Sequence, residues 1–250
     1  MTMNKAIFNT NLKLDYSGEE AINTVCSNLT FAGNGIKKVV ITSCEPNNGK
    51  SFVSIQMAVN MGNRGKRVLM VDADMRMSVL NAHHGVTFKG SKCGLAHVLS
   101  GQCDVKDAIY ETNLQNVYYI PIGAGLQAPL NLIATQFFAE LTKTLGEQFD
   151  LIIFDAPPVG MVIDAAEIAR SCDGSIIVLE YAKTRRRTLK ESKNQMERTG
   201  TPVLGCILNK VVMDRISTKK YYGYGKYGYG KYAYRQGYYR HRSKNDDGEK

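Results

Sequence analysis

The residues best suited to chemistry lie in one short segment, Ser43-Cys-Glu-Pro-Asn-Asn-Gly-Lys-Ser51. The backbone N–H groups of such a loop can point into one concavity, and a helix that follows adds its positive N-terminal end. Lys50 would then reach the outer phosphates of a nucleotide, and the Ser51 hydroxyl would ligate Mg²⁺. Gly49 would let a phosphate approach the backbone closely. The segment therefore predicts a phosphate-binding loop for a nucleotide and Mg²⁺.

The loop departs from the general glycine-rich pattern at two positions. Cys44 stands at the place of the first glycine, and Asn47 stands where tight loops of this kind usually have another. Asparagine tolerates left-handed dihedral angles better than other non-glycine residues, so the loop can still form. The residues expected to contact the nucleotide from this loop are Pro46, Asn47, Asn48, Gly49, Lys50, Ser51 and Phe52.

Acidic residues follow two apolar runs further along the chain. VLMV runs into Asp72 and Asp74, and LIIF runs into Asp155. Ligands of open α/β sheets bind beyond the carboxyl ends of the strands, where the loop would also lie. We therefore expect Lys50, Asp72, Asp74 and Asp155 to be the catalytic set for phosphoryl transfer, with Ser51, Asp72 and Asp155 holding the metal.

A single aspartate at the end of a strand is more often a helix cap or a turn former. The D-x-D-x-R and D-x-P-P segments occur together with the loop, and this combination favours the metal-binding interpretation. Asp164 suits either role, because it also precedes an expected helix. Asn209 ends another apolar run at the presumed nucleotide edge, where related folds read adenine, so it is a candidate for nucleotide binding.

The elements that would position these residues alternate along the chain. Short apolar runs rich in β-branched residues predict buried strands at 39–42, 68–71, 151–154, 175–179 and 203–208, and a weaker one at 117–120. Amphipathic patterns predict helices at 19–30, 51–61, 136–146, 163–170 and 189–198. This alternation predicts an α/β domain with a doubly wound, mostly parallel sheet.

Composition divides the chain into three parts. The 250 residues carry a net charge of +9, and residues 219–250 hold nine basic and three acidic residues, so +6 of that charge lies there and +3 elsewhere. Residues 221–239 also contain nine of the 14 tyrosines, interleaved with glycine, lysine and arginine. Such a segment cannot bury a core. We expect an N-terminal segment with a helix at 1–34, a nucleotide-binding domain at 35–212 and a disordered tail at 213–250.

Several classes of protein are not expected. No run approaches the roughly 18 apolar residues that a membrane span needs, and the N-terminus has no apolar signal-peptide core. The six cysteines lie scattered without close pairs, which argues against a zinc cluster and against a disulfide framework. Reduced cysteines of this kind indicate a cytoplasmic protein.

The motifs occur in a recognisable order. The loop PNNGKS, the segment VLMVDADMR, the strand LIIFDAPPVG and the C-terminal tyrosine cluster follow one another as in bacterial tyrosine kinases. The chain resembles the separate cytoplasmic kinase subunit of Gram-positive capsule and exopolysaccharide systems. This resemblance implies a P-loop NTPase fold like that of the MinD and ParA ATPases. It also implies ATP and Mg²⁺ as cofactors and protein-tyrosine autokinase activity that regulates polysaccharide synthesis and export.

The resemblance implies phosphorylation of the tail by a neighbouring subunit. Flexible tyrosines are good acceptors, since a phenol needs only to be presented in line to the γ-phosphate beside a carboxylate. Each phosphate adds about −1.5 to −2 charges, so a few would cancel the tail's positive charge. The expected acceptors are Tyr221, Tyr222, Tyr224, Tyr227, Tyr229, Tyr232, Tyr234, Tyr238 and Tyr239.

The resemblance also implies partners. These are a transmembrane polysaccharide co-polymerase adaptor, which would activate the kinase at the inner face of the membrane, a cognate tyrosine phosphatase, and further copies of the chain. Members of the family assemble into rings through two arginines at three-residue spacing in an N-terminal helix. Here the matching stretch reads Glu20-x-x-Asn23-x-x-Cys26, so this contact would differ. Nucleic acid is not expected as a partner.

Three alternatives remain open from the residues, two for the tail and one for the whole chain. Tyrosines interleaved with basic residues also suit binding of single-stranded nucleic acid or of an acidic polymer, and such a tail can equally be solvated and inert. The whole chain could instead be a P-loop ATPase of the MinD and ParA type, a nucleotide-switched assembly protein whose tail serves for docking. That class carries a signature lysine early in the loop, where this chain has Glu45.

Overall fold

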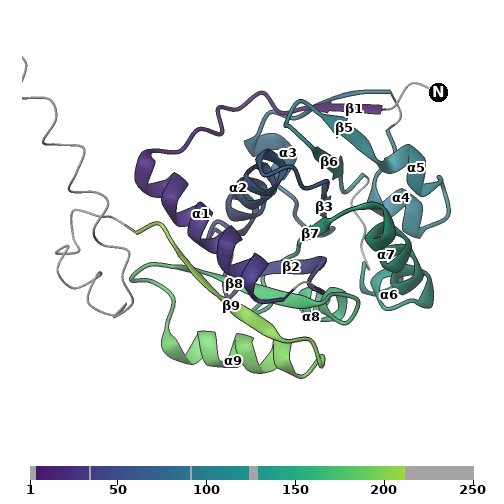
Figure 1. Cartoon of the computed structure of the whole chain (residues 1–250). Helices are drawn as coiled ribbons and strands as arrows, with labels where there is room; N and C mark the ends of the chain where they lie inside the picture. Colours follow the sequence, from purple (N-terminus) through teal and green to yellow (C-terminus); the bar gives the residue numbers. More distant parts are fainter. Residues whose placement is uncertain (1–3, 34, 91, 124–128, 212–250) are drawn as a thin grey trace, which may run out of the picture. The chain divides into compact units, whose positions relative to one another are not determined.

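The computed structural model describes residues 4–33, 35–90, 92–123 and 129–211. The chain up to Lys210 forms one compact unit, and nine strands from its described residues make one sheet (Figure 1). The strands are β1 (Asn4–Ile7), β2 (Lys38–Ser43), β3 (Val68–Asp72), β4 (Thr87–Lys89), β5 (Tyr110–Thr112), β6 (Val117–Ile120), β7 (Leu151–Asp155), β8 (Gly174–Glu180) and β9 (Val203–Asn209). The helices are α1 (Tyr16–Phe31), α2 (Lys50–Asn63), α3 (Leu80–His83), α4 (Leu95–Leu99), α5 (Val105–Ala108), α6 (Leu130–Ile133), α7 (Gln136–Gln148), α8 (Asp164–Ala169) and α9 (Arg186–Glu197).

The sheet has a parallel core. Its strand order is β4-β1-β5-β6-β3-β7-β2-β8-β9, and the six strands from β6 to β9 in this order are all parallel. The doubly wound, mostly parallel α/β fold predicted from the sequence is therefore confirmed. Three short strands extend the sheet beyond β6, and two of their pairings, β5 with β6 and β1 with β4, are antiparallel. These three strands and the short helices α3 to α6 were not predicted from the sequence.

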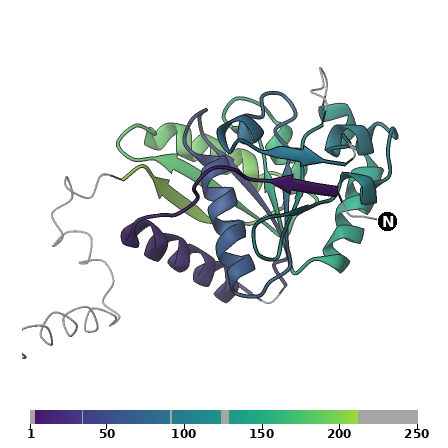
Figure 2. The same ribbon diagram turned by 90° about the horizontal axis from the view of Figure 1, so that it is seen from above.

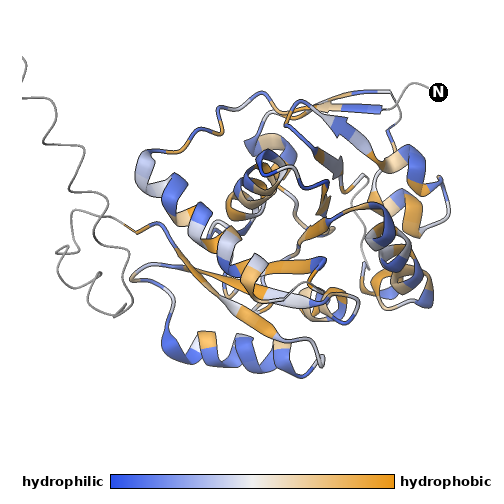
Figure 3. Cartoon of the chain, in the orientation of Figure 1, coloured by the Kyte–Doolittle hydropathy of each residue, from blue (hydrophilic) through white to orange (hydrophobic). Residues whose placement is uncertain are grey.

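Helices cover both faces of the sheet because the central strands are apolar on both sides (Figure 2). In β2, Val39 and Ile41 pack into one cluster with residues of α1 and α2, whereas Val40 packs into another with residues of α4, α7, α8 and α9. These three side chains are fully buried, and each contributes about 1.5 to 3 kcal/mol through burial. Figure 3 shows the same arrangement, with apolar residues in the central strands and polar ones on the outer face of α9.

The carboxyl ends of the parallel strands meet at one edge of the sheet. The phosphate-loop segment follows β2, Asp72 ends β3, Asp155 ends β7 and Asn209 ends β9. Asp72 and Asp155 are direct partners in the β3–β7 register. The fold therefore gathers the candidate residues from four strands at this edge, as expected for a ligand site of this architecture.

None of the helices in the described part of the chain has the length and hydrophobicity needed to cross a bilayer. The nine candidate phosphoacceptor tyrosines, and the tail that contains them, lie outside the described residues.

Candidate nucleotide-binding and catalytic site

The loop between β2 and α2 is stabilised by hydrogen bonds within the loop. Asn47 has a φ of 61° and Gly49 a φ of 88°, so both adopt the left-handed conformation that was expected to be tolerable at Asn47. The Asn48 side chain is buried, and its Oδ1 accepts a hydrogen bond from the Glu45 backbone N–H at 3.0 Å. The loop therefore forms without the glycines usual at positions 44 and 47, because Asn47 adopts the left-handed conformation and Asn48 supplies an internal hydrogen bond.

Helix α2 begins at Lys50 with Gly49 as its N-cap, and no side chain caps the first turn. Its first backbone N–H groups thus remain available to a phosphate, which the helix dipole also attracts. A Cβ at position 49 would lie 2.1 Å from Asn209 Nδ2. Gly49 is therefore required by the fold itself, in addition to the close approach of a phosphate expected from the sequence.

Lys50, the first residue of this helix, is a largely buried cation. Its Nζ is 3.1 Å from Asp74 Oδ2, and the two side chains are only 13% and 7% exposed. Burial favours the neutral amine, but the carboxylates of Asp155 and Asp74 outweigh it and raise the pKa of Lys50. A nucleotide phosphate would therefore meet an ionised lysine that a carboxylate already orients.

Asp72 and Asp155 lie side by side and deeply buried, at 0% and 1% exposure. Burial, and then the charge of Asp155, raises the pKa of Asp72 to about 7. Burial also raises the pKa of Asp155, against the lowering effect of Lys50 and of hydrogen bonds from Ser51 and Ser54. The Ser54 hydroxyl donates to Asp155 Oδ1 at 3.3 Å. Two neighbouring buried carboxylates of this kind favour a cation between them.

The site fits Mg²⁺ that arrives with a nucleotide. Asp72 Oδ1 is buried and has no hydrogen-bond partner in the described residues, which leaves a free ligand atom. Fully ionised, the three aspartates and Lys50 carry a net charge of −2. Within the described residues, no three acidic, histidine or cysteine side chains converge closely enough to hold a metal alone. Mg²⁺ in nucleotide sites typically uses one or two carboxylates together with phosphates and waters.

Arg76 and Asp164 join the two acidic loops. Arg76 Nε and Nη2 donate to the Asp164 carboxylate at 2.7 and 2.9 Å. Asp164 is the first residue of α8 and is 1% exposed. From the sequence, Asp164 could be either a helix cap or a site residue. In the structure its side chain does not cap α8 but forms a bidentate ion pair with Arg76. This pair ties the segment after β3 to the segment after β7.

Residues at the end of β9 also hydrogen-bond to the backbone of the loop. Asn209 Nδ2 donates to the backbone carbonyl of Asn48 at 3.0 Å. Lys210 Nζ donates to the carbonyl of Asn47 at 2.6 Å and to Glu180 Oε2 at 3.0 Å. Lys210 and Glu180 were missed by the sequence analysis, since each is an ordinary charged residue at the end of a strand until the strand order is known.

The remaining candidates differ in position. Pro46 and Phe52 are exposed at the rim of the loop, with Phe52 at 40%, and their contact with a nucleotide stays a prediction. Ser54 was missed, although its place one helical turn after Lys50 is visible in the sequence. The structure thus brings together Lys50 and the three aspartates, and it joins Asn209 to the loop.

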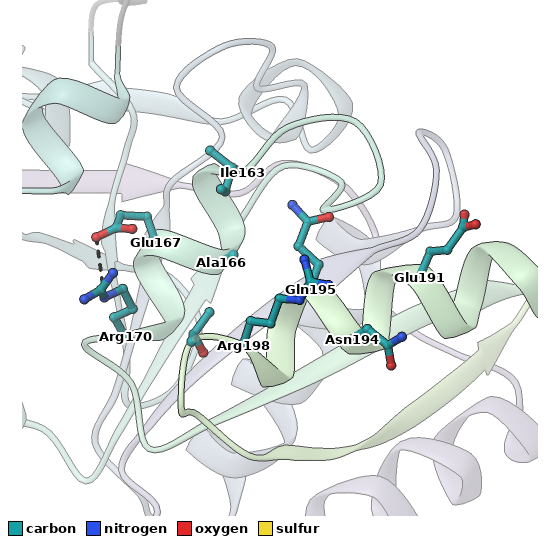
Figure 4. Close-up of a pocket in the computed structure, with 9 residues that line it drawn as sticks. Ile163, Ala166, Glu167, Arg170, Glu191, Asn194, Gln195 and Arg198 are labelled. Carbon is teal, nitrogen blue, oxygen red and sulfur yellow. Dashed lines mark ion pairs between the residues drawn. The ribbon is translucent and has the colours of Figure 1, made fainter.

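Two surface pockets lie away from these residues. One, of about 440 Å³, lies between α8 and α9 (Figure 4). Its lining residues are Ile163, Ala166, Glu167, Arg170, Glu191, Asn194, Gln195, Arg198 and Thr199. The other lies between α1 and α2, beside the segment that contains Leu12 and Leu14. Neither is lined by the loop or by the three aspartates, so neither is the nucleotide site argued above.

Comparison with known proteins agrees with this geometry. The fold and site define a P-loop nucleotide-binding protein, because a phosphate loop follows the first core strand and acidic residues end two neighbouring parallel strands. Residues 36–197 match the family described as AAA domain. The chain is 37% identical over 210 residues to the tyrosine-protein kinase CpsD of Streptococcus agalactiae, covering 83% of this chain and 90% of that relative. The chain belongs to this family of bacterial tyrosine-protein kinases and is a protein-tyrosine kinase.

Solved structures show the same relationship. The kinase domain of the Escherichia coli tyrosine kinase ETK is similar with a TM-score of 0.74 and 28% identity, covering 85% of this chain and 81% of that one. The septum site-determining protein MinD of Pyrococcus horikoshii, in complex with Mg-ADP, is similar with a TM-score of 0.60 and 27% identity, covering 74% and 75%. The fold is thus shared by bacterial tyrosine kinases and MinD-type proteins.

Proposed function

We propose that this chain is an ATP- and Mg²⁺-dependent autokinase that phosphorylates tyrosines in its own C-terminal segment, residues 213–250. One observation carries the proposal: Lys50, the first residue of a helix without a side-chain cap, is paired with Asp74 and lies near Asp72 and Asp155 at the ends of adjacent strands. This arrangement supplies a phosphate cradle, a cation and acidic groups at one edge of the sheet, which phosphoryl transfer requires.

The residues would divide the work as follows. The N–H groups at the start of α2, together with Lys50, bind the β- and γ-phosphates. Ser51, Asp72 and Asp155 would hold Mg²⁺, which neutralises charge on the transferring phosphoryl group. Asp74 is left to accept the phenol proton of the acceptor tyrosine. It now pairs with Lys50, and a phosphate that engages Lys50 would free its carboxylate for that role.

The loop contacts would serve nucleotide binding. The contacts from Asn209 and Lys210 to the loop carbonyls hold the loop against β9. These contacts restrict the loop before the nucleotide arrives, so less conformational freedom is lost on binding. Asn209 would also contact the base of the nucleotide, a role that its position at the end of a strand beside the loop supports.

We extend the proposal to the cellular setting. Phosphorylation would occur between neighbouring copies of the chain, at the inner face of the membrane, under the control of a transmembrane polysaccharide co-polymerase adaptor and a tyrosine phosphatase. The activity would regulate capsular or exopolysaccharide synthesis. Family membership supports this setting, and the high tyrosine content of residues 221–239 supports the identity of the acceptors.

The activity is tested with the purified full-length chain and radiolabelled ATP, with and without the cytoplasmic segment of a candidate adaptor. We expect phosphotyrosine within residues 213–250 by mass spectrometry, and none in Lys50→Met. Lys66→Met is the matched control, because Lys66 is an exposed lysine just beyond the far end of the same helix. Release of phosphate without phosphotyrosine would favour the nucleotide-switched assembly ATPase instead.

The direction of transfer needs a mixing experiment. Lys50→Met with an intact tail is mixed with an otherwise active chain in which all nine tail tyrosines are phenylalanine. Neither chain can label itself, so phosphotyrosine on the Lys50→Met chain shows transfer between copies. If each active chain labels only its own tail, the mixture stays unlabelled while the wild type alone is labelled.

A further inference from the structure

The carboxylate of Asp72 has two very different oxygen atoms. Its Oδ2 accepts a hydrogen bond from the Ser78 hydroxyl and also faces the Tyr119 hydroxyl at 3.3 Å. Its Oδ1 is buried and has no partner among the described residues. The two hydroxyl groups hold Oδ2, and the Asp74 backbone also contacts the carboxylate. Within the described part of the chain, Oδ1 still has no side-chain partner, which suits a metal ligand.

The Tyr119 hydroxyl is shared between two acceptors. It lies 2.8 Å from Asn81 Oδ1 and 3.3 Å from Asp72 Oδ2. A phenol carries one proton, so it can donate to only one of them. The Asp72 carboxylate becomes the stronger acceptor once it is ionised, as it must be to bind a metal. Asn81 Oδ1 is the nearer of the two acceptors, so the phenol lies between Asn81 and Asp72 and links the two side chains.

Tyr119 is held rigidly for this contact. It lies in β6, the strand beside β3, and is fully buried. Its ring packs edge-on against Phe8 at 5.5 Å between centroids and is stacked with Phe88 at 6.4 Å. Phenylalanine would pack equally well at this position, and it would bring no buried hydroxyl that needs a hydrogen-bond partner. The hydroxyl therefore points to a role in the site.

We propose that Tyr119 and Ser78 are positioning residues that hold the Asp72 carboxylate by Oδ2 and so leave its Oδ1 available as a ligand for Mg²⁺. This inference rests on the proposed function, in which Asp72 is a metal ligand. Partners that orient a metal ligand from behind typically change metal affinity about 10- to 100-fold when they are removed. The two residues act through Asp72 and touch neither nucleotide nor acceptor tyrosine.

The chain offers a matched control for Tyr119. Tyr110 is its direct partner in the antiparallel β5–β6 pair, is 1% exposed and also packs against Phe88. Its hydroxyl donates to the backbone carbonyl of Cys93 at 3.0 Å. Tyr119→Phe and Tyr110→Phe therefore remove the same group from equally buried positions, and only the first touches Asp72 in the structure.

The experiment measures metal binding rather than turnover. Full-length wild type, Tyr119→Phe, Ser78→Ala and Tyr110→Phe are titrated with Mn²⁺ in the presence of ADP, and free Mn²⁺ is followed by electron paramagnetic resonance. A parallel titration measures binding of fluorescent ADP without metal. We expect Tyr119→Phe and Ser78→Ala each to weaken Mn²⁺·ADP binding about tenfold, with metal-free ADP binding unchanged and with Tyr110→Phe like the wild type.

Each outcome decides a different question. Wild-type affinity in both Tyr119→Phe and Ser78→Ala overturns the positioning role, whereas failure of the wild type itself to bind Mn²⁺·ADP overturns the proposed function. Equal weakening in Tyr119→Phe and Tyr110→Phe would show a packing effect and also overturn the inference for Tyr119. Ser78→Ala carries the test if a tyrosine variant does not fold, because Ser78 is only half-buried.

Discussion

Replacing Asp72 with asparagine should stabilise the metal-free protein at neutral and alkaline pH. The pKa of Asp72 rises from 3.8 to about 7 because of burial and the neighbouring charge of Asp155. The folded protein therefore binds this proton more tightly than the unfolded chain. The stability contributed by protonated Asp72 is complete below about pH 4 and is lost as the pH rises through about 7. Above that pH the folded state carries the full cost of a buried charge.

The size of the effect follows from that shift. At 1.36 kcal/mol for each pKa unit, the rise from 3.8 to about 7 corresponds to about 4 kcal/mol. An asparagine removes this cost, but it accepts the hydroxyl groups of Ser78 and Tyr119 less strongly than a carboxylate does, so part of the gain is lost. We expect the free energy of unfolding at about pH 8 to rise by about 1 to 3 kcal/mol, with no difference at about pH 4.

Urea unfolding in EDTA, followed by far-ultraviolet circular dichroism, measures this change, since the chain contains no tryptophan to report on unfolding. Asp150→Asn is the control, because Asp150 is an exposed aspartate that accepts a hydrogen bond from the Arg67 backbone and lies outside the acidic cluster. Adding Mg²⁺ and ADP should stabilise the wild type more than Asp72→Asn. A variant less stable than the wild type at about pH 8, or a gain independent of pH, would refute the reasoning.

Two further sets of substitutions, measured by urea unfolding, test the contacts that hold the site together. Arg76→Ala leaves the buried Asp164 carboxylate unpaired and should lower the free energy of unfolding by about 3 kcal/mol. The double variant with Arg76→Ala and Asp164→Ala should lose less stability than the sum of the two single variants. Strictly additive losses of stability would contradict a coupled pair. Gly49→Ala should cost about 1 to 3 kcal/mol, because it strains a φ of 88° and brings a Cβ against Asn209. Adding Asn209→Ala removes the clash but not the strain, so complete recovery would contradict this account.

The long elements of the fold could be predicted because their signal is local. The apolar runs of β2, β3, β7 and β8 mark their own strands, and their length and β-branched content suit a parallel sheet. The short strand β1, with sequence NKAI, has no such signal. It is a strand because β4 and β5 pair with it, and both lie some 80 to 105 residues away in the sequence.

The candidate site divides in the same way. Lys50, Asp72 and Asp155 could be predicted to converge because parallel strands end at one edge, and this follows from the fold class alone. The contact between Tyr119 and Asp72 could not, since it requires β6 to lie beside β3. The ion pair of Arg76 with Asp164 likewise depends on where two loops meet, 88 residues apart in the sequence.

The placement of β1 has a consequence for how the chain folds as it is made. Residues 4–7 pair with residues 110–112, and the Asn113 amide makes two hydrogen bonds to the backbone of Phe8, at 2.8 and 3.0 Å. Strand β1 must therefore wait for about 80 further residues before its neighbour β4 exists, and for about a hundred before its other neighbour, β5, exists. Loop closure over this distance is slow relative to local helix formation. A nascent chain that has not yet reached Thr87 thus carries β1 without either of its sheet neighbours, and one that has not reached Tyr110 leaves one edge of β1 unpaired, so this strand must be kept from other partners until synthesis has passed these points.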